Sequence, residues 1–224
     1  MRQKIKILLV IFFLIFSGSA PSKARKKKKT PNLKIYLTPA LKYSMLGKSL
    51  AVMYEPQLVS MALRIEEELK SPRFELLDTT TSPMASIGFF QNPASVSPTV
   101  RFLGIIARVN IKLTCFPDTE AGRLSSAMDV FGKDLLRILG DTLTNIQDLS
   151  IRGAVLILIY SKAELTDPSY YQQAEAIVMF IPREVLSEFN AFRMRFNQLF
   201  AQSEIFSFKG EHQIQVLLNE FLRG

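Results

Sequence analysis

The single histidine and the single cysteine of this 224-residue chain are the side chains best suited to nucleophilic catalysis. A catalytic triad needs a base between a nucleophile and an orienting acid, and His212 is the one candidate for that base. His212 follows Gly210 at the start of a predicted helix, with no nucleophile pattern around it, so we interpret it as an exposed or capping residue. Cys115 falls on the apolar side of a predicted strand, where packing suppresses ionisation of a thiol. A dyad of these two residues is therefore the minor alternative, and we predict no catalytic residue.

Some side chains of the chain are suited to binding metal ions. Structural zinc needs three or four thiolate or imidazole ligands, and one cysteine with one histidine cannot supply them. Asp118, Glu120 and Asp129 are suited to hard cations, but their spacing matches no calcium loop. Capping of a helix N-terminus explains the first two without a metal. We predict no metal and no cofactor, whereas a pair of carboxylates for glycoside hydrolysis stays open because any two acids can meet in the fold.

The tripeptide GKS at residues 47–49 resembles the end of a nucleotide-binding phosphate loop. The motif requires a glycine five residues before Gly47, where this chain has Lys42. It also requires a helix that starts at the lysine, whereas residues 48–54 (KSLAVMY) have the pattern of a short strand. The sequence therefore predicts no nucleotide site.

The first twenty residues have the order of an export signal. Three bases precede an apolar run at residues 7–16, and small residues at 17–20 suit a signal peptidase. This run is about half the length of ~20 residues that crosses a membrane as a helix. We predict a signal peptide at 1–20, cleaved between about 19 and 24, and a periplasmic or secreted protein. Bases just beyond an apolar run tend to stay in the cytoplasm, so an uncut leader is the alternative.

Positive charge is concentrated ahead of the folded body. The net charge is +8, yet residues 1–29 hold nine bases and no acid, which leaves 19 bases and 20 acids for residues 30–224. A nucleic-acid surface needs clustered bases on the folded domain, so we predict no nucleic-acid partner. Residues 21–32 are predicted to be a flexible basic tail. It either has no role or attaches to an anionic membrane surface or another polyanion, through Arg25, Lys26, Lys27, Lys28 and Lys29.

The periodicity of the body predicts two lobes. Residues 33–80 form a βαβ lobe, with strands at 33–37, 48–54 and 74–78 and a helix that starts near Pro56. The buried face of that helix is defined by apolar residues at helical spacing, namely Leu58, Ala62, Ile65 and Leu69. Residues 81–99 contain three prolines and many serines and threonines, which is typical of a connector.

Residues 100–224 form the second predicted lobe. Alternation at 105–115 predicts a strand with one exposed face, followed by a helix from Asp118 or Thr119 to about Leu143. The apolar runs 154–160 and 176–181 predict central strands covered on both faces. A helix from Pro182, an extended segment at 205–208 and a helix at about 211–223 complete the lobe. The predicted class is α/β or α+β, with a mixed sheet packed against helices.

An aromatic stripe is the most unusual feature of the body. Phe189, Phe192, Phe196 and Phe200 recur at helical spacing after Pro182. Such residues usually face a core, and this is our first interpretation. The functional alternative is a docking ridge for a partner protein or a membrane surface.

Residues 48–80 also resemble an element of bacterial envelope proteins. The predicted strand and helix lead to SPRFELLD at 71–78, a pattern similar to that in the curli secretion channel protein and in the outer-membrane activators of penicillin-binding proteins. The resemblance implies an envelope component and carries no functional residue.

These patterns together predict an exported bacterial cell-envelope protein with a non-catalytic binding or assembly role, whose partner is another envelope protein. One alternative is an exported hydrolase that acts on cell-wall material through a carboxylate pair. The other is a peripheral membrane protein retained by its basic tail.

Overall fold

The computed structural model describes residues 45–69, 74–76, 86–92, 94–95, 97–112, 118–164 and 166–214. The predicted signal, the basic tail, the predicted strand at 33–37 and Cys115 lie outside these residues, as does the predicted last helix beyond residue 214.

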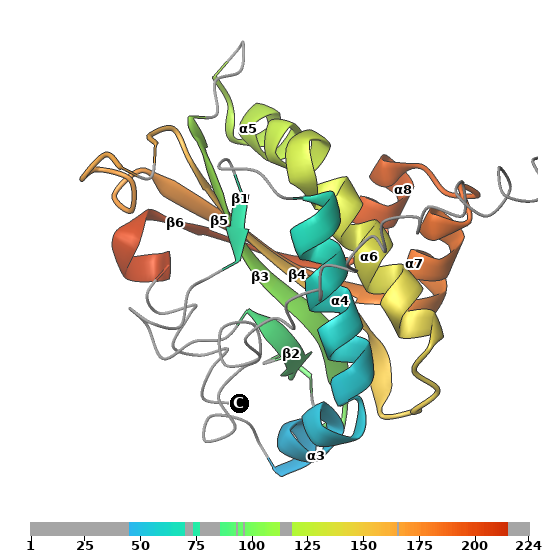
Figure 1. Cartoon of the computed structure of the whole chain (residues 1–224). Coiled ribbons are helices and arrows are strands. Elements are labelled where there is room, and N and C mark those ends of the chain that lie inside the picture. Colours follow the sequence, from blue (N-terminus) through green and yellow to red (C-terminus); the bar gives the residue numbers. More distant parts are fainter. Residues whose placement is uncertain are drawn as a thin grey trace, which may run out of the picture.

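A mixed β-sheet forms the centre of the described structure (Figure 1). Its strands run in the order β1-β3-β4-β5-β6, and β2 pairs with β3 on the same edge as β1. β3 and β4 are parallel, while the other pairs are antiparallel. The predicted α/β or α+β class with a mixed sheet is confirmed. The strands are β1 (Phe74–Leu76), β2 (Ile87–Phe90), β3 (Arg101–Lys112), β4 (Ile151–Ser161), β5 (Ala174–Pro182) and β6 (Glu204–Lys209).

Helices α4 (Glu55–Glu68), α6 (Lys133–Thr144) and α7 (Arg183–Asn190) lie side by side over one face of the sheet (Figure 1). α6 continues from α5 (Glu120–Ala127) through the π-helical segment η1 (Met128–Gly132). The predicted start of this long helix is confirmed, because the Thr119 hydroxyl accepts a hydrogen bond from the Gly122 amide at 3.1 Å. The remaining helices are α3 (Met45–Met53) and α8 (Phe196–Ala201).

The two central strands are buried on both faces, as predicted. On β4, Ala154, Leu156 and Leu158 pack in the core beneath the helices. The alternate residues of the strand join a second apolar cluster on the opposite face, together with Tyr170 and Ile214. Because side chains alternate across a strand, a continuous apolar run is what two covered faces require.

The prediction of a strand at residues 48–54 is wrong, because Met45–Met53 is the helix α3. Its Leu50 is buried, and Tyr54 beyond its end packs against Phe89 with ring centroids 6.1 Å apart. A short apolar run without alternation does not distinguish a strand from a helix. The segment predicted as a strand at 48–54 and the segment that begins near Pro56 are therefore both helical, and the strand at 74–76 pairs with β3.

One further expectation for the sheet differs from the structure. Residues 87–90, inside the predicted connector, form β2 and pair with residues 102–105 of β3. The exposed face predicted for β3 begins at Arg108, and of its residues only Arg108 has a described burial. Ile106, the preceding residue on that face, is fully buried in the second apolar cluster. On the same face, Arg108 is only half-buried and donates to the Tyr171 hydroxyl. Strands from the first predicted lobe and from the connector thus share one sheet with the second lobe.

None of the helices in the described part of the chain combines the length and the apolarity needed to cross a lipid bilayer.

Candidate functional site

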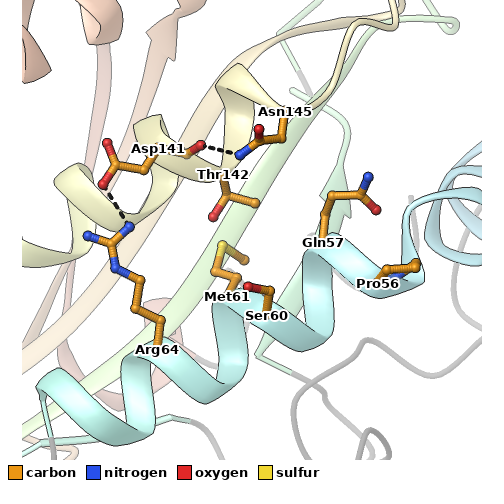
Figure 2. A pocket seen from close by; sticks show the side chains of 8 residues that line it. All are labelled: Pro56, Gln57, Ser60, Met61, Arg64, Asp141, Thr142 and Asn145. Carbon is orange, nitrogen blue, oxygen red and sulfur yellow. Dashed lines mark hydrogen bonds and ion pairs between the residues drawn. The ribbon is translucent and has the colours of Figure 1, made fainter.

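A groove of about 410 Å³ runs between α4 and α6 (Figure 2). Met61 forms part of its lining from α4, and Thr142 does so from α6. The Thr142 hydroxyl donates to the carbonyl of Ile138 at 2.8 Å and is therefore satisfied within its own helix. The groove is lined mostly by polar and charged side chains, with Pro56 and Met61 as its apolar members. The other lining residues are Pro56, Gln57, Ser60, Arg64, Asp141 and Asn145.

An ion pair joins the two helices at one end of this groove. The Arg64 guanidinium donates to the Asp141 carboxylate at 2.7 Å, and Figure 2 shows the two side chains reaching toward each other. Arg64 also binds Glu68 at 2.5 Å, and Glu68 accepts a second bond from Arg137 of α6 at 2.7 Å. The hydrogen bond from Arg64 is the main reason that the pKa of Glu68 lies below its ordinary value. These four residues fix the spacing of α4 and α6 while staying partly exposed to water.

The other end of the groove holds an unsatisfied acceptor. The side-chain oxygen of Gln57 is buried and has no hydrogen-bond partner among the described residues. Ser60 is exposed one turn further along α4, and the Asn145 amide opposite donates to the carbonyl of Asp141 at 3.0 Å. A group that donates a hydrogen bond to Gln57 would remove the cost of its buried, unpaired oxygen.

A second groove, of about 480 Å³, lies on the other side of α6, against α7. Asp141 lines both grooves. From α7, the Asn190 side-chain amide donates to the carbonyl of Arg137 at 2.9 Å and to Asp141 at 3.4 Å, while its oxygen is buried without a partner. This close approach requires Gly140, because a Cβ there would lie 2.2 Å from the Asn190 nitrogen. The grooves contain one carboxylate between them, Asp141, whereas glycoside hydrolysis uses two.

α7 is anchored at its start by Arg183. Its guanidinium donates to three backbone carbonyls, those of Leu143, Ile146 and Ile151, at 2.7 to 2.9 Å. Two of these carbonyls lie at and just beyond the end of α6, where helices leave acceptors unsatisfied. Arg183 and Asn190 therefore hold both ends of α7 against α6.

Phe192 forms the corner between α7 and α8 and is 92% exposed. Its φ of 57° lies in the left-handed region, which costs an ordinary side chain about 1–2 kcal/mol. The Phe192 amide donates to the Phe189 carbonyl and the Arg193 amide donates to the Glu188 carbonyl, both at 3.0 Å. This is the Schellman ending of a helix, in which glycine is the usual residue at the left-handed position. Two bonds from the Arg193 guanidinium to the Glu188 carboxylate, at 2.8 and 2.6 Å, fix the same turn.

The predicted four-phenylalanine stripe is wrong as a single helical face. α7 ends at Asn190 and α8 begins at Phe196, because the left-handed turn at Phe192 interrupts the helix between them. Phe189, Phe196 and Phe200 are partly buried and pack against the core, in line with the packing interpretation. Phe192 alone points into solvent, so the docking interpretation now concerns a single residue.

A buried ion pair lies near the carboxyl end of β4. The Arg123 guanidinium of α5 binds the Glu175 carboxylate of β5 through bonds of 2.8 and 2.5 Å, and both side chains are only 4% exposed. Arg123 also binds Asp118, which Lys162 contacts at 2.6 Å. Burial, and then the charge of Glu175, raises the pKa of the neighbouring Tyr160. Every charge in this cluster has an opposite charge beside it, which is the pattern of a structural anchor.

The remaining candidates from the sequence can also be placed. Asp118 and Asp129 form ion pairs with basic residues, and no group of three metal-ligating side chains occurs among the described residues. Residues 47–49 lie within α3, so the strand that argued against a phosphate loop is absent there, while the lack of a glycine at position 42 still argues against it. His212 is exposed in a short helical turn after Gly210, whose φ is 79°. The basic residues Arg25 to Lys29 lie outside the described residues.

Comparison with known proteins gives no matching family model, no matching curated protein and no matching solved structure.

Proposed function

We propose that this chain is an exported protein of the bacterial cell envelope that binds a partner protein without catalysis, and that the partner docks at the corner formed by Phe192. The observation that carries the proposal is the combination of backbone strain and exposure at this residue. The leader pattern of residues 1–20 and the near-neutral charge of the body support the location and argue against a polyanion as the ligand of this corner.

Glycine would be the less strained residue at position 192. Glycine adopts a φ of 57° without penalty, and it is the residue that helix endings of this type usually contain. Phenylalanine instead adds strain and exposes a large apolar ring to water. Neither effect stabilises the fold, so a gain made outside the fold is the physical reason for this side chain.

The surroundings of Phe192 suit a protein partner. Hydrogen bonds fix the backbone of the turn, so binding orders the side chain of Phe192 without having to order the chain that carries it. Exposed Arg193 and Glu188 are paired with each other beside it and offer a polar rim of both signs. A central aromatic anchor with a polar rim is the usual composition of a binding hot spot.

The test is site-specific photo-cross-linking in cells that produce the full chain. A photoreactive phenylalanine analogue at position 192 is expected to give one discrete protein adduct, whose mass identifies the partner. The matched control is the same analogue in place of Leu149, which is 84% exposed on the loop between α6 and β4. The absence of an adduct at 192, or equal adducts at both positions, would contradict the proposed docking corner.

The location needs its own measurement. Fractionation with N-terminal mass spectrometry of the native protein is expected to find a new N-terminus between about residues 20 and 25 in the periplasmic or secreted fraction. An intact leader on cytosolic protein would contradict export and would leave the cross-linking result to stand separately.

A further inference from the structure

We propose that the outer face of α3 is a docking surface for an anionic lipid bilayer. The face consists of Met45, Val52 and Met53, which are 81%, 70% and 63% exposed. Their spacing of seven and eight residues places them on one side of the helix. The opposite side holds buried Gly47 and Leu50 and packs toward β2 and α4.

The polar groups on this face are compatible with contact between the apolar residues and a bilayer. The hydroxyl of Ser49, between Met45 and Met53 on the helix surface, donates to the carbonyl of Met45 at 2.9 Å and is therefore satisfied within α3. Lys48 is exposed at the edge of the face. A long side chain of this kind can extend its ammonium group to lipid phosphates while the apolar residues lie among the acyl chains.

Charge identifies the lipid as the occupant. The first acidic residue of the chain is Glu55, so residues 1–54 contain twelve bases and no acid, eight of them from residue 25 onward. Basic segments next to an apolar helix face are attracted to anionic membranes, by about a fivefold gain in affinity for each cation near the surface. A second copy of the chain would bring the same positive charge to the interface and would be repelled.

The place of α3 in the fold permits this contact. Figure 1 shows α3 at the end of the helical layer opposite α8, so a bilayer on α3 leaves the α8 end of that layer accessible. The lipid surface therefore does not depend on the proposed partner. A failure of either proposal leaves the other standing.

The test measures insertion at the helix itself. In the full chain, Cys115 is replaced by serine and Val52→Cys is labelled with a fluorophore that shifts to the blue in an apolar environment. Vesicles containing phosphatidylglycerol are expected to produce this shift, vesicles of phosphatidylcholine alone are not, and high salt is expected to reverse it. The control, Leu149→Cys with the same label, is expected to stay unshifted on both. Because the label reports position 52, anchoring by residues 7–16 alone gives no shift.

A second variant tests the affinity. Met45→Ser, Val52→Ser and Met53→Ser together are expected to lower partitioning onto the anionic vesicles on the order of tenfold or more, with unchanged circular dichroism. No shift at position 52, equal shifts at 52 and 149, or a shift that follows protein concentration without vesicles would overturn the proposal. The last result would assign the face to a second copy of the chain.

Discussion

Two arginine–carboxylate clusters hold the helices of this protein in place, and they differ in their access to water. Arg123 and Glu175 join α5 to β5, with both side chains 4% exposed. Arg64 and Asp141 join α4 to α6, with side chains 29% and 45% exposed. The buried pair has lost the solvation that water gives, so each charge depends on the other. The exposed pair gains little from its contact, and its groups remain free to exchange a protein partner for a ligand.

The difference in exposure indicates which charges serve only the fold and which are accessible to a ligand. The exposed cluster lines a groove with an unpaired acceptor at Gln57, whereas every charge of the buried cluster already has an opposite charge beside it. A ligand of the groove could displace Arg64 from Asp141 at small cost. No comparable exchange is available to Arg123.

The largest effect is expected for Glu175→Gln. Removing the charge of Glu175 leaves buried Arg123 with the largely exposed Asp118 as its remaining described partner, so the free energy of unfolding should fall by about 3–5 kcal/mol. Urea denaturation of the variant and the parent protein measures this difference. A loss below about 1 kcal/mol would erase the contrast between the two clusters.

Gly140→Ala should have the next largest effect. The added methyl group meets the Asn190 side chain at 2.2 Å, so the free energy of unfolding should fall by about 1–3 kcal/mol, partly offset by the better helix propensity of alanine. Asn190→Ala in the same chain should remove most of the clash. A double-mutant cycle measures this coupling, and simple additivity would contradict the proposed contact.

Tyr160, beside the buried ion pair, makes the stability of the protein depend on pH in the alkaline range. Its pKa in the folded protein is raised by burial, so the unfolded chain loses the proton first as pH rises above about 10. Below the pKa that Tyr160 has in the unfolded chain, ionisation of Tyr160 does not reduce stability. Above that pKa, the free energy of unfolding should fall by up to about 1.4 kcal/mol per pH unit. Tyr160→Phe should reduce that slope. An identical slope in both proteins would contradict burial of the ionisable hydroxyl.

Glu68→Gln, in the exposed cluster, should have the smallest effect. A loss of about 0–1 kcal/mol is expected at neutral pH, because the ion pairs of Glu68 are partly solvated. The pKa of Glu68 is lowered in the folded protein, so its contribution is present above the unfolded pKa and fades as pH falls through the folded one. Variant and parent stabilities should converge in acid. A loss as large as that expected for Glu175→Gln would show that exposure does not separate the clusters.

Elements with strong local signals were predictable from the sequence. The apolar runs in β4 and β5 and the cap at Thr119 each depend on neighbouring residues, and all three are confirmed. α3 was missed because an apolar helix that keeps part of its apolar surface exposed has no amphipathic period.

The candidate site depends on contacts that no local pattern encodes. Arg64 and Asp141 are 77 residues apart, and Asn190 meets Asp141 from 49 residues away. The spacing of the phenylalanines draws attention to Phe192. Its left-handed backbone is not predictable in this way, because the helix ends there without a glycine.

Two measurements on Phe192→Gly show whether Phe192 lowers the stability of the fold and binds a partner. We predict that the free energy of unfolding rises by about 1 kcal/mol, while affinity for the partner identified by cross-linking falls by about tenfold or more. Ala191→Gly is the matched control, because its φ of −79° gives glycine no advantage, so stability should fall and affinity should not change. A Phe192→Gly protein that is less stable than the parent, or that binds the partner equally well, would show that Phe192 is not a strained docking residue.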